Sequence, residues 1–260
     1  MLIATWNVNS VRTRLEHILR FLDIWKPDIV CLQELKCQTD DFPDMDIRAA
    51  GYQSLVLGQK SYNGVAILCR KTPEIVSYGL PGEETDEQAR FIEAVFHGKN
   101  QKFHVASLYL PNGNPVNSDK YEYKLRWMER LRQHACTLLK NETAFILAGD
   151  YNVIPTEADA ANPEQWIQDA LYLQPTREKY RQILNSGLQD ILRLVRPEPE
   201  IYTFWDYQAG AWQRNNGIRI DHFLTSPRMT DTLQNAFVFK DTRDWEKPSD
   251  HVPVLASFDI

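Results

Sequence analysis

The sequence predicts an α/β fold in which two β-sheets pack face to face and helices cover their outer sides. Short apolar segments of strand length recur along all 260 residues, and only a few longer segments show helical periodicity. Hydrophobic residues make up 43% and charged residues 25%, a globular composition that excludes disordered, collagen-like and coiled-coil classes. Many strands with a few long helices favour sheet packed on sheet.

The N-terminal segment predicts a strand, a helix and a second strand in succession. Residues 2–8 form a short apolar run, and large apolar residues then recur at helical spacing between 15 and 25. Pro27 ends this helix, because the residue before a proline avoids the helical conformation. Residues 28–32 form another apolar run, which is typical of a buried strand.

Strands and two more helices are expected in the rest of the chain. The strands span 52–57, 64–70, 91–96, 103–110, 143–148, 202–207, 218–225, 236–239 and 254–258. Asn63-Gly64 is a turn signal, consistent with a hairpin. Helical periodicity covers 120–139 and about 177–194. Because no flexible linker or fixed-period repeat divides the chain, we expect a single domain over residues 1–260.

Charge and apolar runs restrict the class of protein further. The chain has 29 Lys and Arg against 35 Asp and Glu, a net charge of −6, which argues against holding nucleic acid by bulk positive charge. No apolar run approaches the ~18 residues that span a bilayer, and no signal peptide is visible. The four cysteines lack metal-site spacing. We therefore expect a cytoplasmic protein that makes no membrane contact.

Polar residues recur where the apolar strands end, and their types fit one kind of chemistry. They are Asn7, Glu34, Tyr109, Asp150, Asn152, Asp250 and His251, and Asp221 lies inside an apolar run. Each alone is most often a turn, a cap or an exposed side chain, although a buried aspartate needs a partner. Together, carboxylate and amide oxygens suit Mg²⁺ or Mn²⁺, and a histidine beside acids suits acid–base catalysis or transition-state stabilisation.

Motifs that the chain lacks narrow the chemistry. No phosphate-binding glycine loop and no Gly-x-Ser-x-Gly nucleophile motif occurs in the sequence. Nucleotide-driven transfer and serine catalysis are therefore disfavoured. Metal-assisted hydrolysis remains, with a phosphate ester as the expected substrate.

Six motifs together resemble one known family. They are Thr5-Trp6-Asn7-Val8-Asn9, Leu32-Gln33-Glu34-Leu35-Lys36, Tyr109-Leu110-Pro111-Asn112-Gly113, Gly149-Asp150-Tyr151-Asn152, Arg219-Ile220-Asp221 and Pro248-Ser249-Asp250-His251. In order and spacing they resemble the exonuclease III family of apurinic/apyrimidinic (AP) endonucleases, within the endonuclease/exonuclease/phosphatase superfamily, over essentially the whole chain. The resemblance implies a DNase I-like fold: a four-layered α/β sandwich of two packed mixed β-sheets flanked by helices, with the site at the sheet rims.

The resemblance also implies a reaction, a cofactor and a partner. The reaction is cleavage of double-stranded DNA on the 5′ side of an abasic site, in base excision repair, with Mg²⁺ as cofactor and Mn²⁺ as its substitute. Family members often add 3′-phosphatase, 3′-phosphodiesterase or 3′→5′ exonuclease activity, so DNA with blocked 3′ ends is a second expected substrate. We expect the protein to act as a monomer.

Roles for the metal ligands and the water-activating group follow by position from the resemblance. Glu34 resembles the main metal ligand, with Asn7 beside it and Asp250 as a second metal contact. Asp150 resembles the group that orients or deprotonates the attacking water. Asn152 would hold the phosphate or that water, and both Asp150 and Asn152 are included among the metal ligands.

The remaining catalytic roles concern the phosphate. His251 would bind the phosphate and stabilise its developing charge, while Asp221 would pair with His251 and select its tautomer. Tyr109 would contact the phosphate or assist the leaving group. Either Asp150 or His251 is the general base, and the sequence leaves that choice open.

Substrate contacts are also implied by the resemblance. Phe204, Trp205 and Ile218 match positions that line a pocket for the flipped-out abasic sugar, although a place in the core is an equal alternative for Trp205. Asn112 matches a position that contacts DNA near the scissile phosphate. A basic and aromatic segment could track the DNA backbone, or it could simply form a solvated helix face. Its members are Tyr121, Lys124, Arg126, Arg130 and Arg132.

Two other functions compete with this interpretation. One is a superfamily phosphatase or phosphodiesterase that acts on a non-DNA phosphate ester, which would lack the sugar pocket. The other is a non-catalytic DNA-binding module, which would have lost acids or the histidine. The net negative charge is compatible with DNA binding, because four acids belong to the candidate site and four more cluster within 83–87. We expect a localised basic face and a modest dependence of binding on salt.

Overall fold

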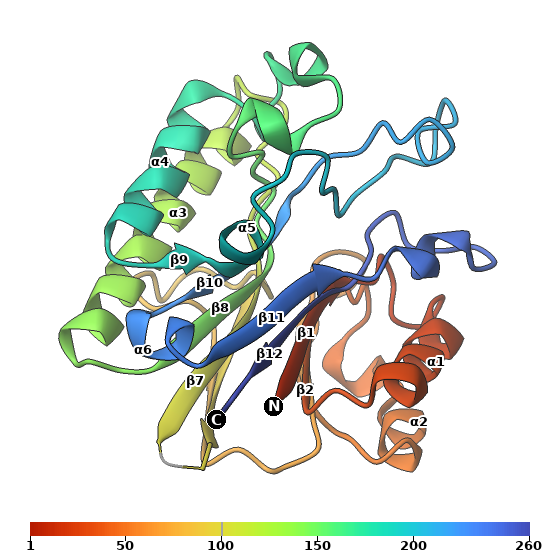
Figure 1. Cartoon of the computed structure of the whole chain (residues 1–260), viewed down its shortest axis with the longest axis vertical. Coiled ribbons are helices and arrows are strands. Elements are labelled where there is room, and N and C mark those ends of the chain that lie inside the picture. Colours follow the sequence, from red (N-terminus) through yellow and green to blue (C-terminus); the bar gives the residue numbers. More distant parts are fainter. Residues whose placement is uncertain (100) are drawn as a thin grey trace.

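Two mixed β-sheets of six strands each pack face to face (Figure 1). The computed structural model describes residues 1–99 and 101–260. The first sheet has the order β11-β12-β1-β2-β4-β3, and the second has the order β5-β6-β7-β8-β10-β9. The first sheet comprises β1 (Leu2–Asn7), β2 (Ile29–Gln33), β3 (Gln53–Leu57), β4 (Val65–Cys69), β11 (Leu233–Val238) and β12 (Val254–Phe258). The second comprises β5 (Ile75–Tyr78), β6 (Phe91–His97), β7 (Lys102–Tyr109), β8 (Phe145–Asp150), β9 (Gln189–Asp190) and β10 (Asp221–Thr225).

Helices cover the outer face of each sheet. Two of them, α1 (Leu15–Trp25) and α2 (Asp44–Ala49), lie over the first sheet, and α3 (Asp119–Lys140) and α4 (Gln174–Asn185) lie over the second (Figure 1). Two shorter helices, α5 (Ile191–Val195) and α6 (Pro227–Thr230), flank β10 in sequence. This arrangement confirms the predicted four-layered α/β sandwich. None of the described helices combines the length and apolarity needed to cross a membrane.

Alternate residues of the central strands fill two different cores. In β2, Cys31 faces the core between the sheets, whereas Val30 and Leu32 face α1 and α2. In β8, Ile146 faces the other sheet, whereas Leu147 packs toward α3 and α4. Because both faces of these strands are covered, their sequences are continuous apolar runs and show no alternation with polar residues.

Two sequence predictions differ from the structure, and several short elements were not predicted. Residues 202–207 are not a strand, because Phe204 makes only isolated bridges, to Ile218 and His251. The helix expected over 177–194 is two helices, α4 and α5, separated by Gly187 at φ +117° and by β9. The short elements β5, β9, α2 and α6 were not predicted, because segments of two to six residues are too short to show a periodic signal.

Strand register brings the candidate site residues to one rim. Parallel pairing places Asn7 of β1 opposite Gln33 of β2, and Tyr109 of β7 opposite Asp150 of β8. Antiparallel pairing places Asp221, the first residue of β10, opposite Asp150 as well. The chain ends lie at the opposite end of the sandwich (Figure 1). The sheets therefore collect side chains from distant parts of the chain at a single edge.

A buried ionic cluster supports this rim beside β10. The guanidinium of Arg219 donates to Asp159 and Asp190, each at 2.6 Å, and approaches Nδ1 of His222 at 3.0 Å. The other ring nitrogen of His222 lies 2.9 Å from the carbonyl of Val153. A neutral ring that accepts at Nδ1 and donates from Nε2 satisfies both contacts. Burial, with Arg219 adding to it, lowers the pKa of His222 to about 4 despite the opposing Asp190 carboxylate.

We expect acid to destabilise the protein through His222. Below pH 6.5 the unfolded chain binds a proton at this histidine that the folded chain excludes until about pH 4, so stability falls as the pH falls through this window. Urea unfolding at pH 7 and pH 4.5 should show that the wild type loses about 2 to 3 kcal/mol more than His222→Gln between these values. Equal losses in the two proteins would contradict this assignment.

Candidate active site

Asp150, Asp221 and His251 form the buried centre of the site. The Nδ1–H of His251 donates to Oδ2 of Asp221 at 2.9 Å, and its Nε2 lies 3.7 Å from Oδ2 of Asp150. Asn7 donates from Nδ2 to the same Asp150 oxygen at 2.9 Å, and the backbone N–H of Asn152 donates to the other at 2.9 Å. One potential ligand atom from each of Asp150, Asp221 and His251 lies within 4.8 Å of the others.

Burial and mutual contact shift the protonation of these groups. Burial raises the pKa of Asp150, and the neighbouring Asp221 carboxylate acts in the same direction, whereas His251 opposes them. For His251, burial disfavours the charged ring, but the Asp221 and Asp150 carboxylates outweigh burial and raise its pKa. The two carboxylates therefore favour the protonated form of His251, whose ring lies between them. One oxygen of Asp221, Oδ1, has no hydrogen-bond partner among the described residues.

Glu34 and Asp250 form a second acidic group on the neighbouring loops. Glu34 accepts a hydrogen bond from the hydroxyl of Tyr109 and lies 3.2 Å from the ammonium of Lys36. Asp250 accepts a hydrogen bond from Nδ2 of Asn9 at 3.0 Å. The side-chain oxygen of Asn9 in turn accepts a hydrogen bond from the ammonium of Lys36 at 2.5 Å. Burial first, and the Glu34 carboxylate next, raise the pKa of Tyr109, so its phenol stays protonated.

The loops that carry this second group adopt unusual backbone conformations. Asn9, Glu34 and Lys36 have φ of 44°, 54° and 53°, in the left-handed region that non-glycine residues seldom occupy. Ser10 has φ of 89°, a value that glycine adopts far more readily. Such strain is retained where surrounding contacts over-determine the backbone, and it often occurs at functional sites. Lys36 was not among the predicted site residues, although it lies in the Leu32–Lys36 motif.

The donor set fits a divalent cation. Glu34, Asp150, Asp221 and Asp250 supply carboxylate oxygens, and Asn7 and Asn152 add amide oxygens. Hard cations of the Mg²⁺ and Mn²⁺ type prefer such ligands. The unpartnered Asp221 Oδ1 is a further free acceptor at this place. These residues could therefore hold the ion.

Asn112 and Asn152 face each other beside this centre. Nδ2 of Asn112 donates to Oδ1 of Asn152 at 3.2 Å, and Nδ2 of Asn152 donates to the carbonyl of Leu110 at 3.0 Å. Asn112 is exposed, so its amide can meet a ligand, whereas Asn152 is buried. These contacts join the loop after β7 to the loop after β8.

Two of the three residues expected to line a sugar pocket do line a cavity. Phe204 and Ile218 line one of about 190 Å³, together with Trp166 and Gln208 among others. The ring of Phe204 lies edge-on to His251 at a centroid distance of 5.0 Å, so the cavity adjoins the catalytic centre. Trp166 lies in the segment 159–175, and no periodic pattern in the sequence marked it as a pocket residue.

The expectation that Trp205 lines the pocket is not supported. Its side chain is fully buried, packs against Tyr202 and Trp212, and donates from Nε1 to Asn215 at 3.2 Å. Successive residues of extended backbone point to opposite sides, so when Phe204 faces the cavity, Trp205 enters the core. Trp205 therefore lies in the hydrophobic core, which was the alternative to a place in the pocket.

The segment 121–132 does not form a continuous DNA-tracking face. Tyr121, Lys124 and Arg130 are buried. Arg130 donates to the carbonyls of Leu80 and Pro81, and it pairs with Glu83 and Asp86 of the acidic cluster. Arg132 pairs with Glu129 at 2.6 Å, which leaves Arg126 as the exposed basic residue of the set. Most of these cations therefore form hydrogen bonds or ion pairs within the protein and do not face the solvent.

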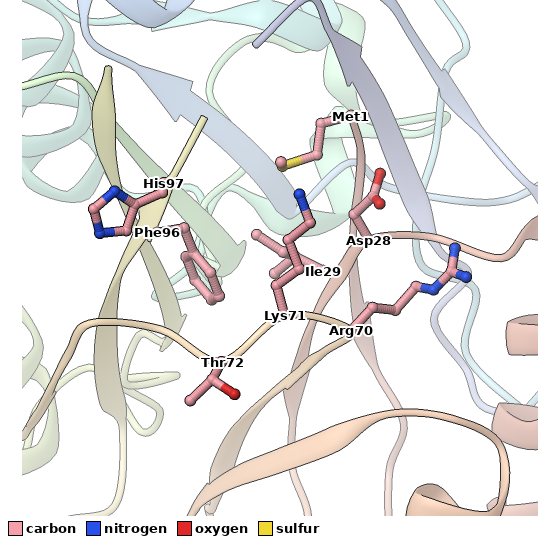
Figure 2. A pocket seen from close by; sticks show the side chains of 8 residues that line it. All are labelled: Met1, Asp28, Ile29, Arg70, Lys71, Thr72, Phe96 and His97. Carbon is pink, nitrogen blue, oxygen red and sulfur yellow. The ribbon is translucent and has the colours of Figure 1, made fainter. Parts of the chain in front are cut away.

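A second cavity lies at the other end of the strands. It has a volume of about 60 Å³, and its lining includes Met1, Asp28, Arg70 and His97 (Figure 2). Met1 and Asp28 directly precede β1 and β2, whereas Asn7 is the last residue of β1 and Glu34 directly follows β2. Six residue steps along each strand separate the two places, roughly 20 Å at 3.3 Å per residue. None of the predicted site residues lines this cavity, which is therefore separate from the candidate active site.

Comparisons with known proteins identify the family. The family model described as "Endonuclease/Exonuclease/phosphatase family" matches residues 4–251. An exodeoxyribonuclease of Bacillus subtilis is 32% identical, with 98% of each chain covered.

Solved structures agree with this assignment. A 3′ phosphatase from Neisseria bound to a product DNA hairpin has 39% identity, and an AP endonuclease from Archaeoglobus fulgidus has 38% identity. Each match covers 100% of both chains with a TM-score of 0.94. The resemblance to exonuclease III-type nucleases is thereby confirmed, and the chain belongs to the metal-dependent endonuclease/exonuclease/phosphatase family of hydrolases.

Proposed function

We propose that this DNA repair nuclease cleaves double-stranded DNA on the 5′ side of abasic sites and also processes blocked 3′ ends, with Mg²⁺ as cofactor. The proposal rests mainly on the buried Asp221–His251–Asp150 arrangement, which lies beside the cavity lined by Phe204 and Ile218. It joins a group that can activate water, a cation that can bind phosphate, and a pocket of sugar size. Relatives described as an AP endonuclease and as a 3′ phosphatase support both activities.

The geometry favours Asp150 as the general base. His251 is held as an imidazolium by two carboxylates, and a ring that already carries its proton cannot accept another. Asp150 has a raised pKa and is oriented by Asn7 and Asn152. In the proposed step the oxygen of water bonds to phosphorus, Asp150 takes the water proton, and the bond from phosphorus to the 3′ oxygen breaks.

Other side chains would stabilise charge and the leaving group. His251 would donate a hydrogen bond from its Nε2–H to a phosphate oxygen, and Asp221 would keep the ring oriented through Nδ1. Burial and the Glu34 carboxylate keep the phenol of Tyr109 protonated, so it would assist the departing 3′ oxygen by supplying a proton. A bound Mg²⁺, with Glu34, Asn7 and Asp250 among its proposed ligands, would supply Lewis-acid stabilisation of the phosphate charge. Asn112 and Asn152 would hold the phosphate or the attacking water.

The pocket would select the lesion. An abasic sugar has no base to accommodate, so the cavity of about 190 Å³ against Phe204 and Ile218 suits it better than a complete nucleotide. We further propose that residues 1–260 form one catalytic domain that acts as a monomer in the cytoplasm. DNA would be held by hydrogen bonds and a local basic face together with the metal, and not by the net charge of the chain.

A comparison of substrates under identical conditions tests this function. With Mg²⁺ we expect the protein to nick a duplex that contains an internal abasic site and to remove a 3′-phosphate, while a recessed normal 3′ end reports the exonuclease activity. A soluble inositol phosphate serves as a non-DNA ester control. Hydrolysis of that ester with no cleavage of any DNA substrate would contradict the proposal.

A further inference from the structure

Lys124 is a fully buried lysine of α3 whose amino group lies between two loops of the candidate site. Its Nζ donates to the main-chain carbonyl of Asn112 at 3.0 Å and to that of Asn152 at 2.6 Å. Among the described residues no carboxylate forms an ion pair with it, and Asp169 and Asp150 act on it only from a distance. The hydrogen-bond partners of Lys124 are therefore two backbone carbonyls.

These carbonyls belong to the residues whose side chains meet beside the catalytic centre. The amides of Asn112 and Asn152 bond each other at 3.2 Å, and the backbone N–H of Asn152 orients Asp150 at 2.9 Å. Without Nζ, the two carbonyl oxygens would face each other in the interior with no donor between them. Buried acceptors without partners are unfavourable, so the loops would separate.

The close approach of the loop to Lys124 is visible at Gly113. This residue has φ +89°, and a Cβ placed on it would lie 2.6 Å from Cδ of Lys124. The Asn112-Gly113 turn therefore wraps directly around the lysine stem. Burial lowers the pKa of Lys124 to about 7, but an amine and an ammonium both carry enough N–H groups for two carbonyls. The bridge therefore does not depend on the charge state.

We propose that Lys124 is a positioning residue of the phosphate site. It acts through the Asn112 and Asn152 carbonyls, and by joining them it sets the places of the two amides relative to Asp150. The inference rests on the proposed function, because it is the hydrolysis of a phosphate ester that these amides serve. Lys124 itself is buried and makes no contact with substrate.

A double-mutant cycle tests the proposal. We expect Lys124→Met to lower kcat by about 30-fold with KM within about 3-fold, because the loss concerns placement in the transition state. In an Asn112→Ala/Asn152→Ala background, the same change should cost less than about 3-fold, because neither amide remains to be misplaced. If Lys124 only stabilised the fold, the kcat losses of the separate variants would multiply in the combined variant.

Arg130→Met is the matched control. Arg130 is a buried cation of the same helix that also binds two main-chain carbonyls, those of Leu80 and Pro81, away from the site. Its loss should lower the melting temperature but leave kcat within about 3-fold of wild type. If Lys124→Met does not fold, Lys124→Gln, which keeps N–H donors on a shorter stem, enters the same cycle.

Three substrates separate the two proposals. The cycle is measured on an abasic duplex, a 3′-phosphate hairpin and bis(p-nitrophenyl) phosphate, a generic phosphodiester. If wild type hydrolyses only the last, the proposed DNA function fails, and the cycle on that diester still decides the role of Lys124. Multiplicative losses, or kcat losses in Lys124→Met and Arg130→Met that follow their melting temperatures, would overturn the positioning role.

Discussion

Replacing Asp150 by asparagine should lower kcat for cleavage of an abasic duplex by about 10³-fold, because the base that takes the water proton is lost. Asparagine has the same shape, and its single carbonyl oxygen keeps an acceptor for one of the two donors, the Asn7 amide or the backbone N–H of Asn152. The fold should therefore persist, and DNA should still bind with a dissociation constant within about 3-fold of the wild-type value. Single-turnover cleavage and a filter-binding titration measure the two quantities separately.

Asp190→Asn supplies a control for the loss of one buried carboxylate elsewhere. Asp190 pairs with Arg219 at 2.6 Å and makes no contact with Asp150 or His251. We expect it to reduce stability far more than kcat, because removal of one partner leaves Arg219 undercompensated. Near-normal turnover in Asp150→Asn would show that His251, or another group, is the base.

Removal of divalent metal should lower cleavage by about three orders of magnitude, since the acids of the site would repel the phosphate without a cation between them. Activity in excess EDTA should fall to background and return when Mg²⁺ is restored in excess of the chelator. Mn²⁺ should also restore it, because both ions accept carboxylate and amide oxygens.

Glu34→Gln gives a more local test of the same site. Loss of the Glu34 charge should raise the Mg²⁺ concentration needed for half-maximal rate, and the effect should be partly overcome by added metal. Circular dichroism of the variant with and without Mg²⁺ checks that the fold is retained. Equal cleavage by the wild type in EDTA and in Mg²⁺ would refute a metal-assisted mechanism.

Much of the fold follows from patterns within short segments. The helical spacing of apolar residues between 15 and 25 identifies α1, and Pro27 places its end to within two residues. The runs that became β1, β2, β4 and β12 are mostly apolar because both sheet faces are covered. Residues 202–207 show where this reasoning fails. The apolar pattern of this segment resembles a strand, but Phe204 makes only isolated bridges, to Ile218 and His251, which lie elsewhere in the chain.

The cationic residues of α3 also show what local sequence patterns predict and what they leave to the tertiary structure. Helical periodicity places them on a helix, but it does not say what each cation meets. Lys124 lies under two loops, and Arg130 lies under the acidic cluster, because the β7–α3 and β5–β6 connections pass over α3 at these points. Exposure of these side chains is a property of packing and is not encoded in local spacing.

The sequence by itself determined the fold class, the family and the set of candidate residues. The apolar patterns of strands and the order of the motifs are properties of short segments, so they can be recognised without a structure. Only the tertiary structure decided how those residues relate to one another. His251 lies between Asp221 and Asp150. Phe204 lines the cavity while Trp205 lies in the core, and Lys124 lies beneath the loops that carry Asn112 and Asn152. The physical reason is that distances, burial and protonation depend on atoms far apart in the chain. These become neighbours only when the two sheets pack.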